Sequence, residues 1–119
     1  MNAIVTGTEY EILAAEYLSQ ANLQLLHRNF RCKLGEIDII ANDGLYLIFI
    51  EVRYRQHDKF GNAAESITLA KQQKIVRTAK FYLQTHIWAQ QLNCRFDVIA
   101  ISNSIKSPQI EWIKDAFHA

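Results

Sequence analysis

Residues 35–55 of this 119-residue chain are GEIDIIANDGLYLIFIEVRYR, and this stretch decides the fold. Two apolar runs that carry acidic residues are separated by Asn42-Asp43-Gly44, which is a typical turn sequence. The pattern predicts two strands, at residues 35–41 and 45–55, joined as a β-hairpin. The first half of the second run is apolar without alternation, which is typical of a central strand covered on both faces.

The turn also predicts how the two strands pair. Asp-Gly is a strong signal for a two-residue type I′ turn, with Asp43 and Gly44 at the tip. Counting back from that tip, we expect Asp38 to face Phe49 and to be a diagonal neighbour of Glu51. A register slip of one residue would place the two acids on opposite faces of the sheet. The side chains predicted to share one face are those of Glu36, Asp38, Glu51 and Arg53.

Acids crowded on one face can be explained in two ways. Carboxylates that lie so near to one another repel each other, unless a cation, a proton or an arginine compensates for their charge. Magnesium typically binds one or two protein carboxylates together with waters and phosphate oxygens. Acids at strand ends are also often simply solvated, and Glu51 with Arg53 could form a surface ion pair of little energetic value. The spacing alone leaves both interpretations open.

Further helices and strands are predicted on both sides of this hairpin. Thr8-Glu9-Tyr10-Glu11 has the form of a capping box and precedes apolar residues at helical spacing, so we expect a helix at about residues 8–21. Thr68 has the side chain of an N-cap for a second helix that runs to about residue 86. Shorter strands are expected at residues 23–30, 95–102 and 109–113. The predicted order is α-β-β-β-α-β-β.

Composition and charge limit the class of protein. A chain of 119 residues fits one domain, and its formal net charge of +1 gives no long-range attraction to nucleic acid, so any binding surface must be a local patch. Two isolated cysteines, Cys32 and Cys94, indicate reduced thiols rather than a disulfide. The N-terminus has no signal-peptide pattern, and the apolar run at residues 45–50 is too short to span a bilayer. We therefore expect a cytoplasmic protein that does not contact the membrane.

The hairpin carries a family resemblance. Residues 35–41 and 48–55 resemble the two signature strands of the bacterial YraN-like family, which is similar to archaeal Holliday-junction resolvases of the PD-(D/E)XK nuclease superfamily. This resemblance implies a restriction-endonuclease-like single domain over residues 1–119, with a mixed central sheet flanked by helices. Fold alone does not settle activity. The similarity extends to Gly7, Glu11, Arg28-Asn29, Phe60-Gly61, Lys71, residues 95–97 and residues 112–117.

The resemblance also implies roles for individual residues. Asp38 and Glu51 correspond to the metal ligands of the superfamily, for Mg or Mn, and the backbone carbonyl of Val52 would be a third oxygen donor. Arg53 occupies the position at which the superfamily pattern has lysine. A guanidinium stays charged, so Arg53 is a poor general base, but it could hold a phosphate oxygen or stabilise charge developing on phosphorus.

Three further residues, Glu11, Lys71 and Lys74, have two interpretations each. Glu11 corresponds to a first-helix acid that completes the site in resolvase-like proteins, and it could also cap its own helix at Thr8. The two roles are not exclusive. Lys71 and Lys74 on the second helix could contact phosphates, as could Arg55, although charged residues on a helix more often form its solvated face.

The leading hypothesis is a Mg-dependent endonuclease or structure-selective nucleic-acid-processing enzyme, with DNA as the first candidate substrate. One alternative is a non-catalytic nucleic-acid-binding module with a degenerate nuclease site. The other alternative is a protein-interaction domain that forms a homodimer. Metal dependence separates the first hypothesis from the second, because a pure binding module would be indifferent to EDTA.

Overall fold

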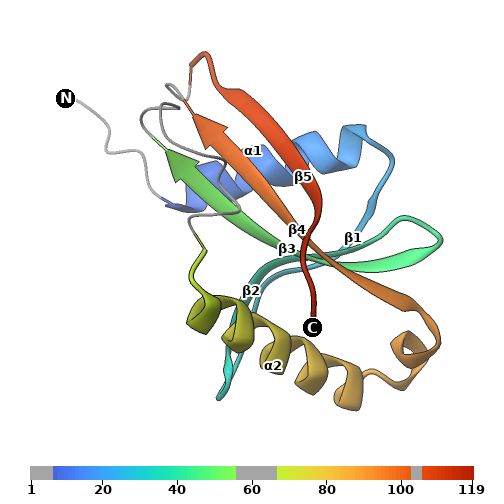
Figure 1. Cartoon of the computed structure of the whole chain (residues 1–119). Helices are drawn as coiled ribbons and strands as arrows, with labels where there is room; N and C mark the ends of the chain where they lie inside the picture. Colours follow the sequence, from blue (N-terminus) through green and yellow to red (C-terminus); the bar gives the residue numbers. More distant parts are fainter. Residues whose placement is uncertain (1–6, 56–66, 103–105) are drawn as a thin grey trace.

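The computed structural model of the chain describes residues 7–55, 67–102 and 106–119. The predicted order of helices and strands is confirmed (Figure 1). The largest differences from the prediction are that the last strand extends to Phe117 and that a short 3-10 helix follows the second α-helix. The elements are α1 (Gly7–Gln20), β1 (Gln24–Cys32), β2 (Gly35–Asn42), β3 (Tyr46–Arg55), α2 (Leu69–Thr85), η2 (Ile87–Gln91), β4 (Asn93–Ser102) and β5 (Gln109–Phe117).

The strands form one five-stranded sheet with the order β1-β2-β3-β4-β5. β3 and β4 run parallel, whereas the other three neighbouring pairs are antiparallel, so the sheet is mixed. A parallel pair needs a crossover connection, and α2 lies on the path from β3 to β4. β3 is the middle strand, and its residues 47–50 are at most 1% exposed. The predicted central strand is therefore confirmed.

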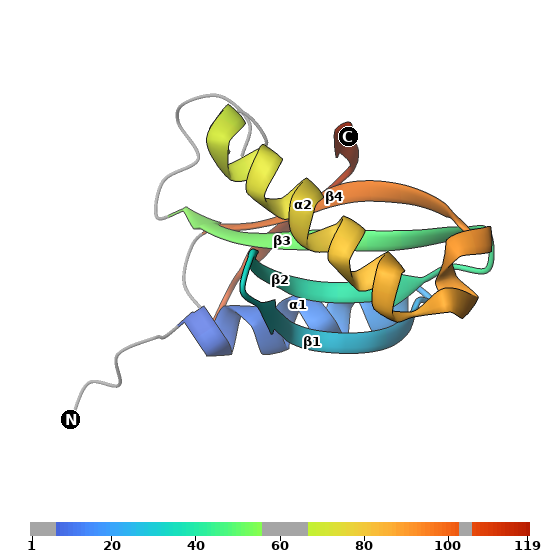
Figure 2. The same cartoon turned by 90° about the horizontal axis from the view of Figure 1, so that it is seen from below.

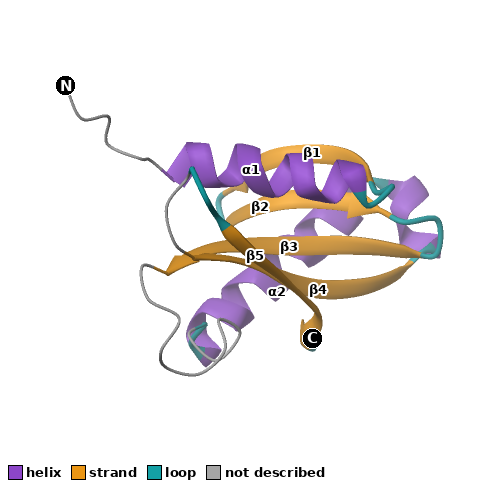
Figure 3. Cartoon of the chain, turned by 90° about the horizontal axis from the view of Figure 1, so that it is seen from above, coloured by secondary structure: helices purple, strands orange, loops and turns teal. Residues whose placement is uncertain are grey.

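Helices α1 and α2 cover opposite faces of the sheet (Figures 2 and 3). Ala14 and Leu18 of α1 share a buried cluster with Ile48 of β3, whereas Tyr82 of α2 shares another with Phe49. Alternate residues of β3 thus pack against opposite helices, as the period of two requires. No helix in the described parts of the chain is long and apolar enough to span a membrane.

The two helix starts differ in how well the sequence predicted them. The Thr68 side chain accepts a hydrogen bond from Lys71 N at 3.1 Å and caps α2, as predicted. The prediction of a capping box that begins at Thr8 is wrong, because α1 already includes Gly7 and Thr8 lies within the helix. The Glu11 side chain is directed to the sheet, where it hydrogen-bonds with Asn29.

The β2–β3 turn lies one residue further along the chain than predicted. Asp43 N donates to Tyr46 O at 3.3 Å, which leaves Gly44 and Leu45 at the tip. Gly44 has φ 96°, and neither Asp43 nor Leu45 has a positive φ, which is the pattern of a type II′ turn. The Asp43 carboxylate accepts from Leu45 N and Tyr46 N at 2.9 and 2.7 Å. These bonds hold Asp43 before the tip instead of at its first position.

The shifted turn changes the strand register by two residues. Ile40 pairs with Phe49 and Ile39 with Ile50, so the predicted pairing of Asp38 with Phe49 is wrong. A shift of two leaves every side chain on its predicted face, since the side-chain period is also two. Continued by one step, the observed register brings Asp38 level with Glu51, directly across the hairpin rather than diagonal to it.

Candidate functional site

Asp38 of β2 and Glu51 of β3 form a buried pair of carboxyl groups. Their exposed fractions are 8% and 7%, although both are ionisable. Val52 N donates to Asp38 Oδ2 at 2.8 Å, and the Glu51 carboxyl group lies close enough to Asp38 for hydrogen bonding between the two to raise the pKa of Asp38. A hydrogen bond between two carboxyl groups requires a proton on one of them.

The environment of Asp38 favours its protonated form. Burial, followed by the hydrogen bond to Glu51 and the Glu51 charge, raises the pKa of Asp38 to about 8. The Val52 N–H acts in the opposite direction and only partly offsets these effects. At neutral pH the pair therefore shares a proton, and a cation bound by both oxygens would take the place of that proton.

Glu11 of α1 lies near this pair and has an altered pKa as well. Burial, together with the charge of Asp38, raises the pKa of the Glu11 carboxyl, while a hydrogen bond with Asn29 lowers it. Asn29 has φ 56°, and the pairs on either side of it, Arg28–Ile39 and Phe30–Ile37, place it level with Asp38. Asn29 is thus a polar residue between Glu11 and the acidic pair whose role the sequence did not reveal.

Two cations among the described side chains border the acidic pair. Lys71 of α2 reaches Glu51, with Nζ 3.4 Å from Oε2, while its own side chain is 44% exposed. Arg53, two residues after Glu51 on β3, is half-buried. The prediction that Lys71 contacts phosphates did not include this ion pair, which depends on how α2 packs against the sheet.

These side chains surround an open cavity of about 210 Å³. The four residues predicted to be catalytic, Asp38, Glu51, Arg53 and Glu11, all line it. Tyr54 stacks on Tyr10 at its rim, with the ring centroids 4.1 Å apart. The described residues that line it are Tyr10, Glu11, Asp38, Glu51, Val52, Arg53, Tyr54 and Lys71.

Other predicted residues lie elsewhere. Glu36 is exposed and forms an ion pair with Arg31 at 2.8 Å, and it does not line the cavity of the acidic pair. Lys74 faces a different cavity. Arg55 is the last residue of β3, and its side chain lies outside the described residues, as do His57, Phe60 and the loop expected at residues 56–63.

A second buried aspartate, Asp97 of β4, has a different environment and was not predicted to be important. It is fully buried, and each carboxylate oxygen accepts two hydrogen bonds. Oδ1 accepts from Arg95 Nε and Asp115 N, both at 2.9 Å. Oδ2 accepts from Arg95 Nη2 at 3.0 Å and Trp112 Nε1 at 2.8 Å. One signal was available in the sequence, since Arg95 and Asp97 are two apart on a strand and so share a face.

The donor set at the acidic pair fits a hard cation that keeps most of its water. Over residues 7–55, 67–102 and 106–119, no group of three or more His, Cys, Asp or Glu residues is arranged to hold a metal ion. Two carboxyl groups are nevertheless sufficient for Mg²⁺, which commonly uses one or two protein carboxylates together with waters and phosphate oxygens. Asp38 and Glu51 are therefore the residues that could hold such an ion.

The fold and the site define a small α/β protein with a buried pair of carboxyl groups in a mixed sheet, bordered by an arginine and a lysine. Residues 10–101 match the family described as "Uncharacterised protein family UPF0102", and the chain belongs to this family. The predicted YraN-like membership is thereby confirmed.

Three UPF0102 proteins illustrate how far the similarity extends. The protein of Stutzerimonas stutzeri is 43% identical, over 96% of this chain and 95% of that protein. The protein of Saccharophagus degradans is 48% identical, over 94% and 92%. The protein of Lachnoclostridium phytofermentans is 44% identical, over 100% and 98%. The similarity thus covers the acidic pair and both helices.

Proposed function

We propose that this protein hydrolyses phosphodiester bonds in nucleic acid with a divalent cation bound at Asp38 and Glu51. We further propose that its fold is restriction-endonuclease-like, in the Holliday-junction-resolvase-like branch of the PD-(D/E)XK superfamily. The observation that supports the proposal is the buried carboxyl pair, which opens onto a cavity lined by Arg53 and Lys71. The protein would act in the cytoplasm, and DNA is the first candidate substrate.

The cation would be Mg²⁺ or Mn²⁺, held by the Asp38 and Glu51 carboxylates, with the Val52 carbonyl as a third oxygen donor. When bound, such an ion lowers the pKa of a coordinated water and stabilises charge on phosphoryl oxygens. The pair must lose its shared proton to bind the ion, so binding should strengthen as the pH rises toward 8.

The surrounding residues would handle charge and protons. Arg53 carries a permanent charge beside the acids, which suits it to hold a phosphate oxygen and to stabilise the charge that develops on phosphorus. The raised pKa of Glu11 makes it a better proton acceptor than an ordinary carboxylate, and it lines the same cavity. Lys71 would exchange its contact with Glu51 for one with phosphate.

The test is calorimetric titration of Mn²⁺ into wild-type protein and into Asp38→Asn and Glu51→Gln variants, with cleavage of branched and linear nucleic acids assayed in parallel. We expect each variant to lose Mn²⁺ binding and cleavage together. Glu36→Gln is a matched control, because Glu36 is an exposed acid on the same strand as Asp38. Equal losses in Glu36→Gln, or no Mn²⁺ binding by wild type with nucleic acid present, would contradict the proposal.

A second candidate function is nucleic-acid binding without catalysis. The observation that favours it is Arg53, a fixed charge at the position where the superfamily pattern has a lysine that can lose its proton. Under this alternative, nucleic acid binds equally well with Mg²⁺ and with EDTA, and no substrate is cleaved. Recovery of cleavage in Arg53→Lys would locate the deficiency at that residue.

A further inference from the structure

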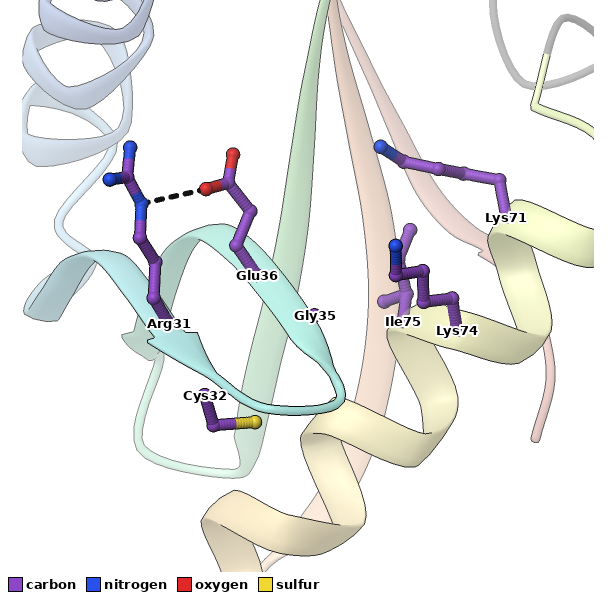
Figure 4. A pocket seen from close by; sticks show the side chains of 7 residues that line it. All are labelled: Arg31, Cys32, Gly35, Glu36, Lys71, Lys74 and Ile75. Atoms are coloured by element: carbon purple, nitrogen blue, oxygen red, sulfur yellow. Dashed lines mark hydrogen bonds and ion pairs between the residues drawn. The ribbon is translucent and has the colours of Figure 1, made fainter.

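Lys71 borders two cavities, and the second lies between the β1–β2 hairpin and α2 (Figure 4). Its volume is about 360 Å³, larger than the cavity of the acidic pair. The hairpin forms one wall, and the first two turns of α2 form the other. The residues that line it are Arg31, Cys32, Gly35, Glu36, Lys71, Lys74 and Ile75.

The lining concentrates positive charge in a protein whose net charge is only +1. Three cations and one carboxylate surround the cavity, and Figure 4 shows their charged ends pointing toward the same side. The one carboxylate, Glu36, is paired with Arg31 at 2.8 Å. Lys74 forms no ion pair with any residue that the structure describes. The cavity is thus a local basic patch in which the Lys74 charge has no ion-pair partner among the described residues.

The wall of this cavity depends on a close approach that only glycine allows. A Cβ atom at Gly35 would lie 2.8 Å from Thr78 Oγ1 and 3.2 Å from carbon atoms of the Lys74 side chain. Thr78 is buried, and its hydroxyl donates to Lys74 O at 2.8 Å. The hairpin backbone and α2 therefore pack directly against each other beside Lys74, so the stem of this lysine is part of a packed wall.

We propose that this cavity binds a backbone phosphate of the nucleic acid strand whose neighbouring phosphodiester lies at Asp38 and Glu51. The inference rests on the proposed function, because it takes the acidic pair as the reacting site. Lys71 lines both cavities, so one lysine would contact both phosphates. Arg31 and Lys74 would hold the second phosphate, with the guanidinium offering two parallel donors. From the acidic pair, the nucleic acid strand would continue into the space between the β1–β2 hairpin and α2.

The first experiment uses inorganic phosphate alone as the probe, followed by ¹H–¹⁵N NMR. We expect titration to shift the backbone amides of Gly35, Lys71 and Lys74, and Lys74→Ala to reduce the phosphate affinity several-fold. Lys80→Ala is the matched control, because Lys80 is an exposed lysine of the same helix that lines another cavity. The same loss of affinity in both variants, or no shift at residues 35 and 74, would overturn the proposal.

The second experiment measures binding of a fluorescent single-stranded oligonucleotide by anisotropy, at low salt and in EDTA. Lys74→Ala should weaken binding about 5- to 10-fold and reduce the slope of log K against log salt by about 0.7, the value for one phosphate contact on a single strand. Glu36 is the one carboxylate among the described residues that line the cavity, so Glu36→Gln should tighten binding. Weaker binding in Glu36→Gln, or an unchanged salt slope in Lys74→Ala, would overturn the inference.

Competition identifies the source of the phosphate. If the cavity holds a backbone phosphate, the oligonucleotide displaces inorganic phosphate and abolishes the amide shifts that it causes. Simultaneous binding of both would assign the cavity to free phosphate and overturn the inference.

Asp38→Asn separates this inference from the proposed function. The variant should lose Mn²⁺ binding and keep phosphate binding at the second cavity. If wild type cleaves nucleic acid and Lys74→Ala does so with unchanged KM, this inference fails while the proposed function stands. If phosphate binds as expected but wild type binds no Mn²⁺, the proposed function fails, and so does the placement of the second phosphate next to a reacting one.

Discussion

Asp38 and Asp97 are both buried aspartates of one sheet, on β2 and β4, but their surroundings differ. Asp97 accepts four hydrogen bonds from N–H groups, two of them from the guanidinium of Arg95. Asp38 accepts one from Val52 N, and a second carboxyl group, Glu51, lies against it. A buried carboxylate with donors at both oxygens stabilises the fold, whereas one placed against another acid requires a proton or a cation.

The difference shows which buried acids are candidates for function. Burial alone would have selected Asp97, which is less exposed than Asp38. The number of hydrogen-bond donors selects Asp38 instead, since its environment disfavours the charged form that an aspartate normally has at neutral pH. The same conservative substitution, aspartate to asparagine, should therefore have opposite effects at the two positions.

The largest effect is expected for Asp97→Asn. In either orientation, the new amide nitrogen faces two N–H donors in place of an oxygen, so two charge-assisted hydrogen bonds are lost. We expect a loss of about 3–5 kcal/mol in the free energy of unfolding, measured by urea denaturation followed by circular dichroism. A loss below about 1 kcal/mol would contradict the structural role that we assign to Asp97.

An intermediate effect of opposite sign is expected for Asp38→Asn in metal-free buffer. The pKa of Asp38 is raised from 3.8 to about 8 in the folded protein. The folded state therefore holds a proton that the unfolded state releases, so the contribution of Asp38 to stability is present below about pH 4 and is lost as the pH rises through 8. Asparagine does not ionise, so the variant does not lose stability in this way. Its unfolding free energy should exceed that of wild type by on the order of 2 kcal/mol at pH 8.

The measurement is the difference in unfolding free energy between Asp38→Asn and wild type at several pH values from 4 to 9. Taking the difference cancels the contributions of carboxyl groups that both proteins share, including Asp43, whose pKa is lowered. The difference should grow in favour of the variant as the pH rises. A difference that stays constant with pH would show that Asp38 is ionised in the folded protein throughout this range.

A smaller effect is expected for Trp112→Phe, which sharpens the comparison by removing a single donor. The substitution takes the Nε1–H from Asp97 Oδ2 and leaves the two Arg95 donors and Asp115 N in place. We expect the unfolding free energy to fall by about 1.5 kcal/mol. A loss as large as that of Asp97→Asn would mean that packing of the indole, and not its hydrogen bond, dominates.

The sequence predicted the arrangement of the acidic residues better than it predicted the turn that produces it. Asp-Gly indicated a type I′ tip at Asp43, but the Asp43 carboxylate binds the two amides that follow Gly44 and moves the tip by one residue. The resulting register shift is even, so Asp38 and Glu51 remained on one face. An odd shift would have separated them.

Contacts between distant segments could not be predicted in the same way. The ion pair of Lys71 with Glu51 depends on how α2 packs on the sheet, and no local spacing encodes it. The hydrogen bonds of Asp97 with Trp112 and Asp115 join β4 to β5. They form where β4 has a bulge between residues 96 and 98 and where Asp115 of β5 has a positive φ. Local periodicity determines elements and faces, while such contacts follow from how the elements pack.

The short β2–β3 hairpin has a consequence for the order of folding. It brings Asp38 and Glu51 together through local contacts, whereas Lys71 arrives only when α2 docks. Contacts between residues close in sequence generally form faster than distant ones. The acidic pair therefore meets before its lysine is present, and its repulsion opposes the nascent hairpin. We expect stopped-flow refolding of wild type to slow between pH 5 and pH 8 relative to Asp38→Asn, so that the carboxyl pair limits how quickly the chain can fold.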